Sequence, residues 1–279
     1  EDTYVVAQVA PAVRVALGEM FGLKPGETVT GKITAALRML GFDAVYDTSF
    51  GADLTVAEEA AEFLERREAG ERLPMFTSCC PAWVKFAEQS FPELLPNLSS
   101  CMSPQSMVGS LVKRTVPEER GVDAAQVKVV AIMPCTAKKY EAQRPELSRE
   151  GEPYVDHVLT TAELGRMIQE AGIRFADLPA SSMDLPMGFI SGAGVIFGNS
   201  GGVAEAVARY VGEGETLNVA VVQGIAEAKH LAREVREGRS DYDLIEVMAC
   251  PGGCIGGAGQ PVSFERETHS RRAEGLREN

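Results

Sequence analysis

The chain has 279 residues, of which 45% are hydrophobic, so it is long enough to bury most of its apolar surface in one large domain or two lobes. Its 40 acidic residues outnumber 27 basic ones. The net charge of −13, without a block of Lys or Arg, argues against nucleic acid or an anionic membrane as a partner. No run of about 18 apolar residues occurs, so no insertion into a membrane is expected.

Apolar runs rich in β-branched residues predict strands along the whole chain. The predicted strands cover residues 4–9, 42–46, 127–133, 158–161, 218–222 and 244–249. Amphipathic patterns predict helices over residues 13–21, 26–40, 55–67 and 226–235, one from Pro81, one capped by Thr160 and Glu163, and a helical segment late in residues 190–211. This alternation predicts an α/β fold with two lobes of mostly parallel sheet flanked by helices, the active site buried between them, and a lobe boundary near residues 100–130.

One predicted helix carries acidic residues among apolar ones. Thr55, with Glu58 three residues later, predicts the start of this helix through a capping box. The expected buried stripe consists of Val56, Ala60, Phe63 and Leu64. Glu59 shares this apolar face because it lies three or four residues from members of the stripe, and Glu62 and Arg66 continue along the same side.

Six cysteines lie at positions 79, 80, 101, 135, 250 and 254. Cys80, Cys135 and Cys250 each follow a predicted strand, at the edge where open α/β sheets bind ligands. The Pro-Gly-Gly sequence between Cys250 and Cys254 excludes helix and predicts a loop that can wrap closely around a bulky group. Adjacent cysteines rarely bridge each other, and a chain of this size does not need disulfides, so a metal or catalytic role ranks above a disulfide framework.

Several kinds of site fit these cysteines. Cys80, Cys135, Cys250 and Cys254 supply the four thiolates that a 4Fe-4S cubane or a tetrahedral zinc ion requires. A structural zinc site usually uses paired C-x₂-C motifs, which the chain lacks. A phosphate-binding loop at residues 250–259 is a weaker alternative, because the Lys-Ser/Thr pair of a P-loop is absent. Single cysteines at several strand ends favour an iron–sulfur cluster deep inside the domain.

Three segments resemble the signature segments of the catalytic domain of FeFe-hydrogenases, in the same order. They are TSCCPAW (77–83), MPCTAKKYE (133–141) and EVMACPGGCIGGAGQP (246–261). The segments QVAPAVRVALGE (8–19) and SGAGVIFGNSGGV (191–203) also resemble the family, so the similarity covers nearly the whole chain. The resemblance implies an enzyme that reversibly reduces protons to H₂.

The same resemblance implies a cofactor in two parts. A 4Fe-4S cluster is expected on Cys80, Cys135, Cys250 and Cys254, with Cys254 bridging to a diiron subcluster that carries CO, cyanide and azadithiolate ligands. Lys138 is expected to donate a hydrogen bond to a cyanide, since a cationic donor suits an anionic ligand. The residues expected to line the diiron pocket are Pro11, Ala12, Ser103, Gln105, Met133, Pro134, Phe197 and Met248.

A proton relay is also implied by the resemblance. Cys79 is expected to pass protons to the diiron site, and Glu59, Ser99 and Glu62 to connect it to the surface, with Arg66 at the outer end. Buried carboxyl groups hold protons more readily than exposed ones, which suits this role. Taken without the cysteine motifs, the two glutamates are more typical of a solvated helix face.

Partners follow from what the sequence lacks. No C-x-x-C-x-x-C run occurs, so accessory ferredoxin-like domains are expected to be absent. Electrons are then expected from a redox partner such as ferredoxin, from another electron-transfer subunit or from a segment outside this sequence, and the diiron unit implies maturation proteins. A reducing cytoplasm is the default compartment, with the periplasm as the alternative.

The sequence is compatible with two other functions. One is a hydrogenase-like sensor or cluster-assembly protein without appreciable turnover, and the other is a plain 4Fe-4S electron carrier. Sensory and assembly relatives tend to lose Cys79 or the two glutamates of the relay, whereas this chain has all three.

Overall fold

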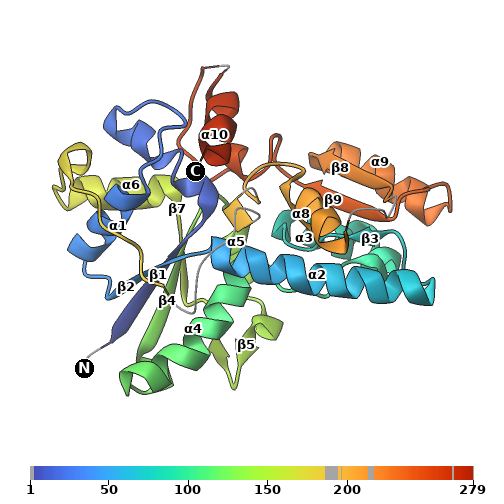
Figure 1. The fold of residues 1–279 in the computed structure, drawn as a ribbon, viewed down its shortest axis with the longest axis horizontal. Helices are drawn as coiled ribbons and strands as arrows, with labels where there is room; N and C mark the ends of the chain where they lie inside the picture. The colour runs from blue at the N-terminus through green and yellow to red at the C-terminus, as the bar shows by residue number, and fades with distance from the viewer. Residues whose placement is uncertain (1–2, 186–193, 196, 213–216, 266, 279) are drawn as a thin grey trace.

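The computed structural model describes residues 3–185, 194–195, 197–212, 217–265 and 267–278, which form two lobes, each built on a parallel sheet (Figure 1). The first sheet has the order β2-β1-β4-β7 and consists of β1 (Tyr4–Val9), β2 (Ala44–Asp47), β4 (Val127–Met133) and β7 (His157–Thr160). The second has the order β3-β9-β8 and consists of β3 (Met75–Phe76), β8 (Val219–Gln223) and β9 (Leu244–Met248). A small antiparallel pair joins β5 (Ser148–Arg149) and β6 (Glu152–Pro153). The predicted α/β fold with parallel sheets is confirmed.

The two sheets alternate along the chain. Among the described strands the chain passes from one sheet to the other three times, after β2, after β3 and after β7. The boundary expected near residues 100–130 marks only the second of these passages. Each lobe is therefore assembled from segments that are far apart in the sequence.

Helices flank both sheets. The α-helices are α1 (Thr30–Met39), α2 (Ser49–Ala69), α3 (Pro81–Ser90), α4 (Pro104–Arg120), α5 (Ala137–Ala142), α6 (Thr161–Glu170), α8 (Gly202–Val211), α9 (Ile225–Arg236) and α10 (Thr268–Arg277). Short 3₁₀ helices cover Pro11–Val13, Leu17–Phe21, Pro92–Asn97, Ala124–Gln126, Pro145–Leu147, Phe175–Asp177 and Cys254–Gly256. The long helix α2 packs on α4 of the first lobe and on α8 of the second, so it connects the lobes (Figure 1). None of the described helices combines the length and apolarity needed to cross a membrane.

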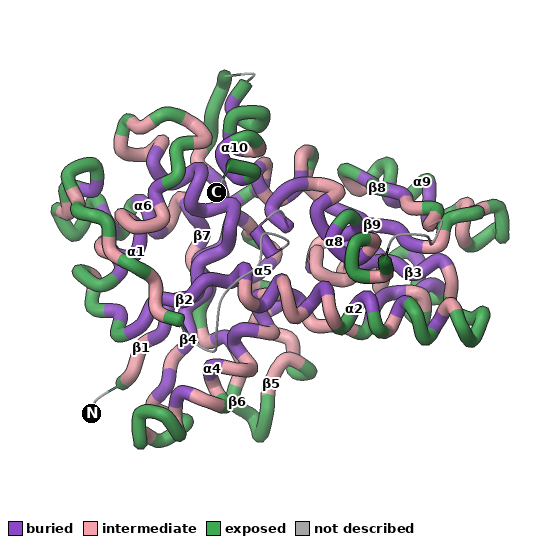
Figure 2. The backbone as a smooth tube through the Cα atoms, in the orientation of Figure 1, coloured by how far each residue is buried: buried purple, intermediate pink, exposed green. Residues whose placement is uncertain are grey.

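Helices cover both sheets, and most strands appear as largely buried segments in Figure 2, although Val221 and Gln223 of the edge strand β8 are exposed. All seven residues of β4 except Lys128 are buried, as are all five of β9. Such continuous apolar runs are typical of parallel strands with both faces covered, and here they position the loops that follow them.

Several helix boundaries differ from the sequence predictions. Helix α2 begins at Ser49, so Thr55 lies inside it and donates its hydroxyl back to the Gly51 carbonyl (2.9 Å) instead of capping the helix; the predicted capping box is wrong. Leu64 is 41% exposed, so its predicted place in the buried stripe is wrong. Helix α1 starts only at Thr30, since Gly26 has a φ of +85° that no helix accommodates.

Other local predictions differ in kind. Residues 13–21 do not form one helix, because two short 3₁₀ helices carry this stretch instead. The polar sequence near the end of the chain does not predict a helix, yet α10 forms there. The capping box of Thr160 and Glu163 at the start of α6 is confirmed, as is β4 to the residue.

Candidate active site

A cavity of about 90 Å³ lies where loops from the two sheets meet. Loops that follow β1 and β4 of the first sheet and β3 and β9 of the second contribute to its wall. Strands β1 and β4 are neighbours at which the strand order reverses, which is the usual ligand site of an open α/β sheet. One water needs roughly 10–15 Å³ of such space, so the cavity has room for a group of several atoms.

The four cysteines predicted as ligands all line this cavity. Cys80 precedes α3, Cys135 follows β4, Cys250 follows β9, and Cys254 begins a 3₁₀ helix. Burial is the largest cause that raises the pKa of the Cys254 thiol, and the charges of Cys135 and Cys80 raise it further. Burial likewise raises the pKa of Cys250, with additional repulsion from the same two thiols.

Cys80 and Cys135 contribute to the raised pKa of both Cys250 and Cys254, because thiolates around one cavity would repel one another. No disulfide relieves the repulsion, since all six cysteines are free. Thiolates become the ligating form when a metal supplies compensating positive charge. The donor set therefore fits a cationic metal group with an affinity for sulfur.

The spacing of these side chains argues against a single metal ion. Among the described residues, no three Cys, His, Asp or Glu side chains are placed to hold one ion. Zinc–sulfur bonds of about 2.3 Å require ligand sulfurs within roughly 4 Å of one another. Four cysteines around one cavity without that proximity suit a larger group, such as a cubane cluster, better than zinc.

Glycines allow the loops around the cysteines to pack closely. Gly253 has a φ of +85°, and a Cβ there would lie only 2.6 Å from the Ser200 backbone nitrogen. A Cβ on Gly257 would overlap the carbonyl oxygen of Pro134. The backbone between Cys250 and Gly257 is thus fixed against both neighbouring loops, which agrees with the predicted close wrapping around a bulky group.

Seven of the eight residues predicted to line the diiron pocket also line this cavity. They are Pro11, Ala12, Gln105, Met133, Pro134, Phe197 and Met248. Ser103 is the exception, because it lines a neighbouring cavity of about 190 Å³ instead. Among the described residues, neither the Ser103 hydroxyl nor the Gln105 Oε1 has a hydrogen-bond partner, although both atoms are buried.

Lys138 reaches this cavity from the first turn of α5, with only 9% of its surface exposed. Its Nζ donates to Glu141 Oε2 (2.7 Å) and to the carbonyl oxygen of Cys79 (3.1 Å). Gln105 Nε2 also donates to Glu141 (3.2 Å). The ammonium group is thus held beside the cavity by a buried carboxylate.

Cys79 lines the cavity beside Cys80, and Glu59 lies behind it on α2. Burial raises the pKa of the Cys79 thiol well above its usual value, and the Glu59 charge raises it further. Glu59 itself is fully buried, and burial raises the pKa of its carboxyl to about 7, against opposing hydrogen bonding by Ser99 and the Ser78 backbone. Neither carboxyl oxygen makes a hydrogen bond of good geometry within the described part of the chain.

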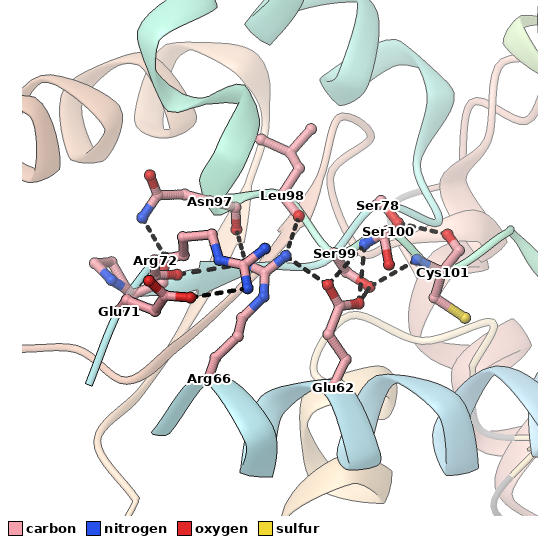
Figure 3. Close-up of polar contacts among 11 residues, drawn as sticks. Glu62, Arg66, Glu71, Arg72, Ser78, Asn97, Leu98, Ser99, Ser100 and Cys101 are labelled. Carbon is pink, nitrogen blue, oxygen red and sulfur yellow. Dashed lines mark hydrogen bonds and ion pairs between the residues drawn. The ribbon is translucent and has the colours of Figure 1, made fainter. Parts of the chain in front are cut away.

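A hydrogen-bonded cluster continues from this point toward the surface (Figure 3). The Ser99 hydroxyl donates to Glu62 Oε2 (3.1 Å), and the Ser100 backbone N–H donates to the same oxygen (2.9 Å). Arg66 Nη2 donates to Glu62 Oε1 (2.5 Å) and to the carbonyl oxygen of Leu98 (2.7 Å). The Glu62 side chain is 17% exposed and that of Arg66 only 3%, so Glu62 is the member that faces solvent.

Residues 3–258 match the family of the iron only hydrogenase large subunit, C-terminal domain. The chain belongs to this family. Iron-only hydrogenases carry iron–sulfur cofactors, and the four thiols of the cavity fit such a group. The FeFe-hydrogenase resemblance found in the sequence is therefore confirmed.

Two hydrogenase subunits illustrate the match. The periplasmic Fe hydrogenase large subunit of Nitratidesulfovibrio vulgaris is 46% identical over 92% of this chain and 68% of its own length. The NADP-reducing hydrogenase subunit HndD of Solidesulfovibrio fructosivorans is 45% identical over 93% of this chain, which spans about half the length of that subunit. A structure of FeFe-hydrogenase HydA1 from Chlamydomonas reinhardtii superposes with a TM-score of 0.88 at 38% identity, over 98% of this chain and 84% of that one.

The hydrogenase family also has relatives with another named role. The cytosolic Fe-S cluster assembly factor narfl of Danio rerio is 32% identical over 93% of this chain and 72% of its own length. The lower identity places this chain nearer to the hydrogenases. Family membership alone does not separate the two roles, because relatives with either name match nearly the whole chain.

Sequence reasoning missed two buried carboxylates of this hydrogenase fold. Glu141 holds Lys138, and its position three residues later on a helix was a usable signal. Glu246 is completely buried in β9, where a charged residue interrupts the apolar run from Leu244 to Met248. A charge inside a strand buried on both faces indicates a specific partner.

Proposed function

We propose that this chain is the catalytic domain of an FeFe-hydrogenase that reversibly reduces protons to H₂. The observation that carries the proposal is the shared wall of one cavity: it brings together four cysteine thiols, the free Cys79 thiol and the Lys138 ammonium. A carrier of a plain cubane has no need of the last two. Cys80, Cys135, Cys250 and Cys254 would hold a 4Fe-4S cluster, with Cys254 bridging to a diiron unit bearing CO, cyanide and azadithiolate.

When bound, the diiron unit supplies the site at which protons and electrons combine. The residues around it hold and orient the group and exclude water. Met133, Phe197 and Met248 line the cavity with apolar, polarizable surface, which adds no competing proton donors. Lys138 would donate to an anionic ligand of the group, and its ion pair with Glu141 fixes its direction.

Protons would reach the site through residues of α2 and the Ser99 loop. Glu62, the more exposed member, would exchange protons with solvent and pass them through the Ser99 hydroxyl to Glu59. Glu59 suits an intermediate position, since a carboxyl with a pKa of about 7 both accepts and releases protons near neutral pH. Cys79 would make the last transfer. Arg66 acts as a positioning residue, because it is buried and holds Glu62 in place.

Electrons would come from a redox partner such as ferredoxin or from another electron-transfer subunit, and maturation proteins would install the diiron unit. The second candidate function is cluster assembly or sensing without appreciable turnover, which the 32% identity to an assembly factor favours. The chain has Cys79 at the cavity wall, Glu59 buried behind it and Glu62 at a partly exposed position, which supports turnover. We place the protein in a reducing cytoplasm, with the periplasm as the alternative that one hydrogenase relative illustrates.

Infrared spectroscopy combined with an activity assay tests the proposal. Protein carrying the 4Fe-4S cluster is loaded with a synthetic diiron complex and assayed for H₂ evolution with a reduced dye. Bands of bound CO and cyanide together with H₂ evolution are the expected result. Absence of the bands would eliminate the diiron site, and bands without H₂ evolution would leave the assembly or sensor function as the better description.

A further inference from the structure

Glu246 is a buried carboxylate outside the proposed ligands and relay. It lies in β9, four residues before Cys250, and its side chain is fully buried. Its Oε1 accepts the Gly201 backbone N–H (2.7 Å), and its Oε2 accepts that of Ala204 (2.8 Å). Both donors belong to the start of α8, whose first N–H groups have no partner within the helix. The carboxylate therefore fixes α8 to the strand that leads into the cysteine loop.

The turn ahead of α8 contacts that cysteine loop directly. The Ser200 N–H donates to the Gly252 carbonyl (3.3 Å), and the Ile255 N–H donates to the Gly198 carbonyl (3.2 Å). Gly253 lies so close that a Cβ there would approach the Ser200 nitrogen to 2.6 Å. The loop from Cys250 to Cys254 is thus held along its length by the turn of residues 197–201, whose first two residues also line the cavity.

We propose that Glu246 is a positioning residue for the iron–sulfur cluster, because its carboxylate fixes the N-terminus of α8 and, through the turn of residues 197–201, the loop that carries Cys250 and Cys254. The inference rests on the proposed function, which places the cluster on these cysteines. The ligand loop continues from β9 at its Cys250 end. Toward Cys254 it contacts the turn of residues 197–201, which Glu246 attaches to β9. Movement of α8 away from β9 would therefore displace the loop.

Two substitutions grade the loss of this contact. Glu246→Gln keeps one acceptor oxygen but turns an NH₂ group toward a backbone N–H, so half of the contact is lost. Glu246→Ala leaves the buried Ala204 N–H and the partly buried Gly201 N–H without this acceptor. Residues that orient metal ligands typically contribute about 10- to 100-fold to metal affinity. We expect iron loss to a chelator to accelerate by about that factor in the alanine variant and by less in the glutamine variant.

A matched control separates positioning from general stability. Asp156 is another carboxylate with a largely covered side chain (8% exposed), and it accepts the Val129 backbone N–H (2.8 Å) and pairs with Lys113 (2.8 Å) beside the four-stranded sheet. Asp156→Asn lowers stability without touching the cysteine loop. The proteins are reconstituted with iron and sulfide alone, so only the cubane forms. Iron release, the electron paramagnetic resonance spectrum of the reduced cluster and its midpoint potential are measured beside the melting temperature.

The proposal predicts altered spectra, shifted potentials and faster iron release in both Glu246 variants, with the Asp156 variant matching wild type in spectrum and potential. If the Glu246 variants lose melting temperature but keep the wild-type spectrum, potential and iron release, Glu246 is only structural and the inference is overturned. Wild-type protein that binds no four-iron cluster would overturn the proposed function, and the inference with it.

Discussion

Burial of Glu59 predicts a stability that depends on pH. The pKa of this carboxyl rises from an ordinary 4.5 to about 7, chiefly because the fold removes it from water. The folded state therefore holds the proton more tightly than the unfolded state does. Below about pH 4.5 the carboxyl is protonated in both the folded and the unfolded state, so it does not lower the free energy of unfolding. The folded state then loses stability as the pH rises from about 4.5 through 7.

The size of the effect follows from the shift. At about 1.4 kcal/mol for each pH unit, the fully ionised group lowers the free energy of unfolding by about 3 kcal/mol. Glu59→Gln removes the titration and keeps the shape of the neutral carboxyl. Relative to wild type, the variant should gain about 3 kcal/mol between pH 4 and pH 8, of which less than about 1 kcal/mol appears by pH 5.

Urea denaturation of the reduced apoprotein measures this difference. Trp83, the only tryptophan, is fully buried and packs on Phe76 with ring centroids 5.3 Å apart, so its fluorescence reports unfolding. Glu58→Gln, at an exposed position on the same helix, is the control for the substitution itself. Parallel pH profiles for wild type and Glu59→Gln would show that Glu59 does not keep its proton in the folded state.

Three further predictions concern individual side chains. Cys79→Ala should leave the infrared bands unchanged and lower H₂ evolution by about 10²- to 10⁴-fold, because a positioned proton donor contributes that much. Cys101→Ser is the control, since this thiol lies outside the cavity, and its H₂ evolution should match wild type. Equal rates for the two variants would refute the relay. Lys138→Ala should reduce retention of the diiron complex without altering cubane iron, and unchanged loading would count against its contact with the group. Arg66→Met should lower the free energy of unfolding, measured by urea denaturation, by about 3 kcal/mol, because Glu62 and buried carbonyls lose their donor. Arg209→Met, which removes an exposed ion pair, is the control and should have little effect.

Much of the architecture could be predicted from local patterns. Valine-rich runs gave β1 and β4 to the residue, because strands buried on both faces consist of continuous apolar sequence. Local sequence patterns do not predict that α2 starts as early as Ser49. The Gly51 position packs against Pro104 and Val108 of α4, so contact with a distant segment stabilises a helical turn that the local sequence does not signal.

The site was predictable to a different extent. Cysteines at strand ends indicated where ligands would gather, since parallel strands share one carboxyl edge. The anchors of that site were not apparent, because Glu246 contacts N–H groups more than forty residues earlier in the chain. The hydrogen-bond donors for such a carboxylate depend on how separate elements pack. The strand pattern shows only that a buried charge needs a partner.

The interleaved order of the strands affects how the metal site and the fold depend on each other. Cys135 follows a strand of the four-stranded sheet, whereas Cys80, Cys250 and Cys254 belong to loops of the three-stranded one. A group bound to all four thiols would link the two lobes, in addition to the link that α2 makes. Loss of the bound group would therefore weaken the contact between the lobes.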